Sequence, residues 1–152
     1  MVEAVTVIRS LHILFAILWA GGGIHYARVT WPALRATSLE APFIGASKHG
    51  PFMGLTSLGT VGFGLATYMM VGPDSYSSAG NAILGVGMLA AVVALINGFA
   101  GHLPTEIKIR HAVDDGDEDE LDRLLGKEHV LGLISLGTVA VAILSMVTFR
   151  WF

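Results

Sequence analysis

Four long apolar stretches constrain what this sequence can fold into. They cover, to within a few residues, about 5–27, 51–71, 82–101 and 130–149. Each reaches the roughly 20 residues that a helix needs to cross a bilayer. A segment in lipid must satisfy its own backbone hydrogen bonds, so helices are expected rather than strands. The sequence therefore predicts an all-α integral membrane protein, a single domain over residues 1–152 with four transmembrane helices in an up-and-down bundle.

The distribution of Lys and Arg predicts the orientation of that bundle. Most of the basic residues lie in the first and third connections: Arg28, Arg35, Lys48, Lys108, Arg110, Arg123 and Lys127. Only Arg9 and Arg150 lie on the other side. Connections rich in Lys and Arg stay in the cytoplasm. We therefore expect a multi-pass protein of the cytoplasmic membrane with both termini outside.

The two cytoplasmic connections carry different patterns. The segment 31–48 is half apolar and is expected to lie along the membrane surface. The segment 102–129 is strongly acidic and is expected to be a cytoplasmic loop. Within it, we expect a solvated turn followed by a short amphipathic helix through Leu121, Leu124 and Leu125.

The sequence also contains an internal repeat. Residues 54–61 read GLTSLGTV, and residues 132–139, which lie 78 positions later, read GLISLGTV. Residues 21–25 and 98–102 share a Gly-rich pattern that ends in His, at an offset of 77. The agreement of the two offsets predicts two repeated helical hairpins, related by an axis along the membrane normal.

Histidines are the main candidates for chemistry in this chain. The chain has no cysteine, which excludes iron–sulfur clusters, thiolate-ligated haem and c-type haem attachment. One histidine lies near the cytoplasmic end of each apolar stretch: His25, His49, His102 and His129. His12 lies in the outer half of the first stretch, where ionisable groups are rare and usually functional.

A haem b site between diagonal helices would account for this arrangement. In an up-and-down bundle the first and third helices are diagonal, so His25 and His102 would face each other across the core. Gly21 and Gly98 precede them by four residues and would let a flat macrocycle lie against each helix. The haem propionates would then meet the remaining basic groups at that level, which are His49, His129 and Arg28.

Two further cofactor hypotheses remain open. His12 and Met88 lie at similar depth on diagonal helices and could ligate a second haem. The imidazoles could instead bind copper or zinc directly, because imidazole does not select among these metals. The sequence therefore predicts one or two haems b, with copper or zinc as the alternative.

The first stretch resembles the first helix of a superfamily of small membrane proteins. The shared pattern is Leu11-His12, followed by an aromatic-Gly step at Trp19 to Gly22, followed by Arg28. The superfamily includes the CopD-type copper-resistance proteins and the haem-containing four-helix protoporphyrinogen IX oxidases of bacteria. The resemblance implies that His12 is a haem or metal ligand and that Arg28 lies near a carboxylate.

Departures from that superfamily favour one of the candidate functions over the others. The oxidases carry a Lys near the start of the third helix, where this chain has Ile83, Leu84 and Gly85. The extra imidazoles favour a haem b protein that transfers electrons to or from a quinone or a redox partner protein. The alternatives are a porphyrin-oxidising enzyme, a copper or zinc transporter, and a cofactor-free accessory subunit. We expect the protein to lie in the lipid bilayer and to bind no nucleic acid. Association into a homo-oligomer is compatible with the sequence.

Overall fold

The computed structural model describes residues 2–30 and 49–149, so the predicted surface segment 31–48 lies outside the described residues. In chain order the elements are α1 (Val2–His25), η1 (Tyr26–Thr30), α4 (His49–Val71), η2 (Pro73–Ser75), α5 (Ser78–Ile96), η3 (Asn97–His102), α6 (Leu103–Asp115) and α7 (Glu118–Thr148). Here η1 and η3 are π-helical segments that continue the helices before them. Within the described ranges there is no strand, as the sequence predicts.

Four continuous helical stretches are long and apolar enough to cross a membrane. They run over Glu3–Val29, His49–Val71, Ser78–Asp115 and Glu118–Thr148. All four predicted spans fall within them, apart from the last residue of the fourth. The prediction of four membrane-spanning helices is thus confirmed at the level of length and composition.

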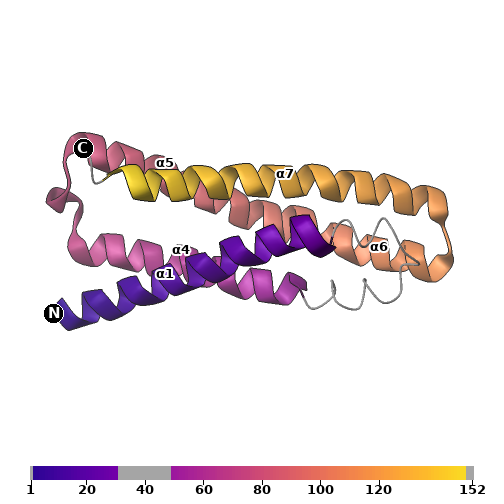
Figure 1. Ribbon diagram of the computed structural model, residues 1–152, viewed down its shortest axis with the longest axis horizontal. Helices are drawn as coiled ribbons and strands as arrows, with labels where there is room; N and C mark the ends of the chain where they lie inside the picture. The colour runs from indigo at the N-terminus through magenta and orange to yellow at the C-terminus, as the bar shows by residue number, and fades with distance from the viewer. Residues whose placement is uncertain (1, 31–48, 150–152) are drawn as a thin grey trace.

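The helices form two closely packed pairs, which Figure 1 shows side by side. The helix α1 packs mainly on α4, and α5 packs mainly on α7. Fewer contacts join the pairs, through α4 with α5 and α1 with α7. This arrangement makes α1 and α5 diagonal, as in an up-and-down bundle. The start of α1 and the end of α7 lie at the same end of the bundle, beside the turn that joins α4 to α5 (Figure 1).

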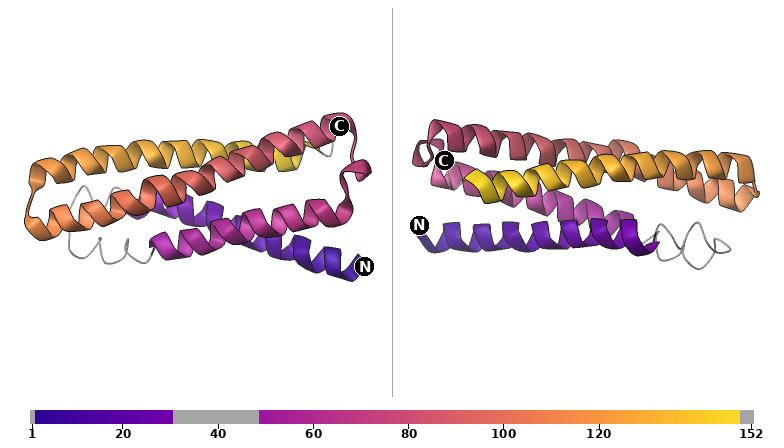
Figure 2. Two further views of the ribbon diagram at one scale, coloured as in Figure 1. Left: turned by 180° about the vertical axis from the view of Figure 1, so that it is seen from behind. Right: turned by 45° about the horizontal axis from the view of Figure 1, so that its top comes forward.

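The segment 102–129, expected to be mainly a loop, is almost wholly helical. The helices α6 and α7 form a hairpin that extends past the ends of α1 and α4 (Figure 2). Gly116 turns the chain with a φ of 67°, a left-handed conformation that favours glycine. The hairpin is helical because Ile109 and Ala112 of α6 pack against the buried leucines of α7. The predicted stripe of Leu121, Leu124 and Leu125 is therefore correct, but it belongs to a much longer helix.

Small residues set the close approach within each pair. In α1 and α4, a side chain at Gly59 would collide with the ring of Phe15. In α5 and α7, a Cβ at Gly87 would lie 2.7 Å from the Cβ of Ser145. Large apolar side chains such as Ile17, Leu89 and Leu144 point outward instead. Small residues inside and large apolar residues outside are typical of helices that pack in lipid rather than in water.

Candidate functional site

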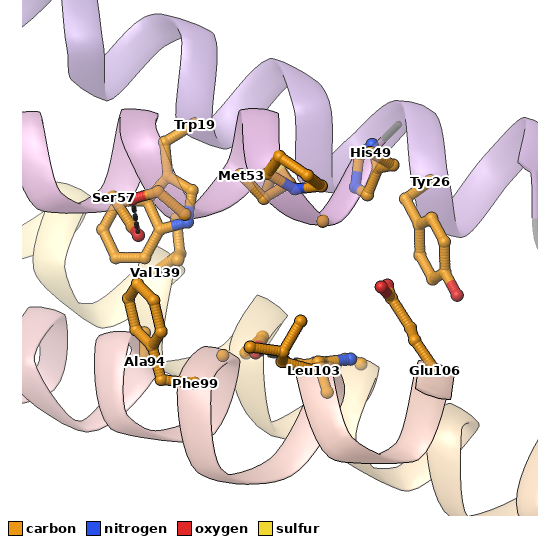
Figure 3. Close-up of a pocket in the computed structure, with 18 of the residues that line it drawn as sticks. Trp19, Tyr26, His49, Met53, Ser57, Ala94, Phe99, Leu103, Glu106 and Val139 are labelled. Atoms are coloured by element: carbon orange, nitrogen blue, oxygen red, sulfur yellow. Dashed lines mark hydrogen bonds between the residues drawn. The ribbon is translucent and has the colours of Figure 1, made fainter. Parts of the chain in front are cut away.

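A cavity lies between the two helix pairs. Its volume is about 530 Å³, and residues from α1, η1, α4, α5, η3, α6 and α7 line it. Figure 3 shows Trp19, Tyr26, His49 and Met53 on one side, facing Phe99, Leu103 and Glu106 on the other. The walls are mainly apolar and aromatic. Among the described residues that line it, none is Lys or Arg, and the polar groups gather towards the end where α6 begins.

Both copies of the repeated sequence contribute the same positions to this cavity. Gly54, Ser57 and Leu58 line it from α4. The residues that match them in the repeat line it from α7: Gly132, Ser135 and Leu136. Equivalent faces of the repeated segments thus meet across one space, which is consistent with the predicted pair of hairpins.

The most unusual polar contact at the cavity joins His102 and Glu128. The Nδ1–H of His102 donates a short hydrogen bond to Oε1 of Glu128, whose side chain has no exposed surface. The hydroxyl of Tyr26 also approaches that oxygen, at 3.4 Å. The other carboxylate oxygen, Oε2, is buried and has no hydrogen-bond partner within the described part of the chain. A carboxylate in such a place is costly unless it is paired, so His102 is what makes Glu128 tolerable there.

A hydrogen-bonded network holds the opposite edge of the His102 ring more loosely. The Oγ atom of Ser135 lies 3.2 Å from Nε2 of His102, which is long for a hydroxyl hydrogen bond. The side-chain amide of Asn97 donates to that same Oγ at 2.8 Å and to the Leu131 carbonyl at 2.9 Å. Nδ1 is therefore firmly bonded, while Nε2 has only a weak partner at the cavity wall.

His49 supplies the second imidazole of the cavity. Its ring stacks on Tyr26 of η1, with the ring centroids 4.7 Å apart and the planes 18° from parallel. Glu106 of α6 lies nearby, and a Cβ at Gly50 would be only 2.7 Å from its Oε2. The cavity thus ends in two imidazoles, two carboxylates and one phenol, all delivered by different turns of helix.

Two π-helical segments border this polar end. Tyr26 begins η1, and His102 ends η3. A π-helical turn inserts extra backbone into a helix and shifts the faces that follow, and such turns are frequent at functional sites. Here the inserted turns coincide with the two ring side chains that contact Glu128.

Five of the predicted site residues lie outside the cavity, and three of these are exposed. His25, Arg28 and His129 are exposed and do not line it. The reason for His25 is helical phase: the cavity side of α1 and η1 carries Trp19, Gly23 and Tyr26, and neighbouring residues are about 100° apart around a helix. The expected pair of His25 and His102 facing each other is therefore not formed, and Gly21 is likewise exposed.

His12 and Met88 also lie away from this cavity. The Nδ1–H of His12 donates to the Thr60 carbonyl at 2.8 Å, and the ring lies against Gly64 of α4. His12 is thus turned towards its neighbouring helix rather than towards the diagonal helix that carries Met88. His12 thus forms a hydrogen bond between two packed helices.

Neither Glu106 nor Glu128 is among the site residues that the sequence predicts, although the sequence contains a signal for Glu128. Leu121, Leu124, Leu125 and Glu128 follow the spacing i, i+3, i+4, i+7, which places them on one face of a helix. A carboxylate that continues a buried apolar stripe must have a buried partner. That partner could not be identified from the sequence, because His102 is 26 residues away on another helix.

The donor groups do not form a bare metal site. Among the described residues, no three His, Asp or Glu side chains are close enough together to hold a metal ion. A haem iron needs only one or two protein ligands, so this finding does not bear against haem.

Neither a protein-family model nor a curated protein nor a solved structure matches this chain. The resemblance seen in the first helix therefore stays a prediction. The function has to be inferred from the chemistry of the cavity itself.

Proposed function

We propose that this protein is a membrane haem b protein that transfers electrons, with the haem in the cavity between the helix pairs and His102 as an iron ligand. The observation that carries the proposal is the Nδ1–H of His102 donating to buried Glu128. Histidines that bind a metal almost always donate their other ring N–H to a carboxylate or a carbonyl, which leaves the remaining nitrogen free for the metal. In His102 that nitrogen is Nε2.

The residues present fit a flat macrocycle. A cavity of about 530 Å³ lies within the range of cofactor pockets. Gly98 and Gly132 both line it, and a Cβ at either glycine would meet nothing within 4 Å. Gly98 lies one helical turn before His102, so a planar ring bound at His102 could rest against bare backbone.

His49 is the second ligand in this proposal, in place of His25. It is the other imidazole that lines the cavity, and it comes from the opposite helix pair. Stacking on Tyr26 limits the orientations of its ring. The hydrogen bond between His12 and Thr60 leaves Nε2 of His12 available for the second haem considered above, but no described contact brings Met88 to it.

Haem iron supplies a reversible one-electron couple when bound, and the protein supplies the surroundings. Trp19, Phe99 and Met53 give the cavity apolar walls. Asn97 donates to the Leu131 carbonyl and to Ser135 Oγ, and these bonds join η3 to α7 beside the His102 ring. A quinone in the bilayer or a redox partner protein would exchange the electron. Copper or zinc is less well supported, because it needs a cluster of ligands that the described residues lack.

The same proposal includes an orientation in the cytoplasmic membrane. The excess of Lys and Arg in the first and third connections supports a cytoplasmic position for the hairpin of α6 and α7. The turn between α4 and α5 would then face outward, together with both termini. The haem would lie towards the inner side of the membrane, where a cytoplasmic partner could reach it.

Absorption spectra test the function directly. The protein is expressed with added haem precursor, purified in mild detergent and examined by reduced-minus-oxidised difference spectra. Wild type should show the sharp α and β bands of low-spin haem b, and His102→Ala should lose most of its haem. His111→Ala, which changes an exposed imidazole on α6, is the matched control and should resemble wild type. Colourless wild-type protein would overturn the proposal.

A further inference from the structure

We infer that Glu128 is a positioning residue for the haem ligand: it fixes the orientation of His102 and makes Nε2 a stronger electron donor to the iron. This inference rests on the proposed function. It concerns a residue that lies 26 positions from His102 and on a different helix.

Two residues of α7, which lie two helical turns apart, contact the imidazole of His102. Glu128 binds the Nδ1 edge, and Ser135, two helical turns later, lies beside the Nε2 edge. Nδ1 is bonded to a buried carboxylate, whereas the contact of Nε2 is to a hydroxyl oxygen 3.2 Å away. Nε2 is thus the nitrogen that would hold the iron, and Glu128 would hold the ring through Nδ1.

The burial of Glu128 argues that the carboxylate has a purpose beyond packing. Only 1% of the residue is exposed, and it continues the apolar stripe of Leu121, Leu124 and Leu125. A leucine at this position would avoid the cost of desolvating a charge. Tyr26 approaches the same oxygen from η1, so the carboxylate also links the two helix pairs at the cavity wall.

A carboxylate on Nδ1–H has a defined effect on a metal-bound imidazole. It fixes the tautomer and the ring orientation, and it increases electron donation through the other nitrogen. Ferric iron benefits more than ferrous iron from that donation. The bond should thus tighten haem binding and make the midpoint potential more negative.

Haem titration and redox potentiometry on matched variants test this inference. Haemin is titrated into haem-free wild type, Glu128→Gln and Glu118→Gln in detergent, and the midpoint potential of each loaded protein is measured. Glu118 is exposed at the start of the same helix and is the control for loss of a carboxylate. For Glu128→Gln we expect haem affinity to fall by roughly tenfold to a hundredfold and the potential to become more positive.

The outcomes separate the two proposals. If wild type binds haem and Glu128→Gln matches Glu118→Gln in affinity and potential, the role of Glu128 is refuted while the haem function stands. If wild type binds no haem, both fall. Circular dichroism checks the fold of each variant. Should Glu128→Gln fail to fold, Glu128→Asp keeps the charge at shorter reach and should still weaken binding measurably.

Discussion

Glu128 on α7 and His102 at the end of η3 share one short hydrogen bond at the wall of the cavity. The bond joins α7, which forms the hairpin with α6, to the π-helical segment η3 that follows α5. It therefore ties the position of an imidazole to the packing of α7.

Replacing His49 should change the coordination of the haem but not abolish its binding. In His49→Ala, His102 remains as a ligand, so the low-spin spectrum should give way to a five-coordinate, high-spin spectrum. His25→Ala should keep the wild-type spectrum, because His25 is exposed and does not line the cavity. Absorption spectra of both variants check this. If His25→Ala loses the low-spin spectrum and His49→Ala keeps it, the assignment of His49 is wrong. The ligands would then be His25 and His102, as the sequence predicts.

Filling the cavity should block haem without unfolding the helices. A Cβ at Gly98 meets nothing within 4 Å, so Gly98→Val should be accommodated in the haem-free protein. Overpacking costs about 1–3 kcal/mol, and haem affinity should fall by roughly tenfold to a hundredfold. Gly85→Val is the control, because Gly85 is exposed on α5 and lies outside the cavity. Haem titration with parallel thermal unfolding distinguishes a blocked site from a damaged fold.

Removing His12 should weaken the packing of α1 on α4 and leave the haem spectrum unchanged. His12→Ala deletes the hydrogen bond to the Thr60 carbonyl. Hydrogen bonds between membrane helices average about 0.6 kcal/mol and reach roughly 1.7 kcal/mol, so the free energy of unfolding should fall by about 1 kcal/mol. Denaturation in detergent measures the loss, with Ile17→Ala on the outer face as the control. Loss of haem in His12→Ala would instead make His12 a ligand, as the family resemblance implies.

The chain lends itself to a test of orientation because it contains no cysteine. Single cysteines can be placed at two exposed positions, Asp74→Cys in η2 and Asp115→Cys at the end of α6. A maleimide that does not cross membranes should label the first in intact cells and the second only after permeabilisation. The reverse pattern would show that the protein is inserted with the opposite orientation.

The lengths of the apolar stretches were enough to predict the helices, and the predicted amphipathic helix was correct around Leu121, Leu124 and Leu125. Apolar length alone did not reveal that the third helical stretch continues through α6, or that α7 begins at Glu118, well before the fourth predicted span. Their extension depends on α6 and α7 packing against each other, with Gly116 reversing the chain between them.

By itself the sequence determined that this chain forms long apolar helices, that cysteine chemistry is absent, and that imidazoles gather at one end of the bundle. The tertiary structure decided which of those imidazoles enter the cavity. A shift of one residue turns a side chain by about 100° around a helix, so Tyr26 lines the cavity and His25 does not. It also decided the partner of His102, because a contact between distant helices depends on how their faces pack and leaves no mark in local spacing.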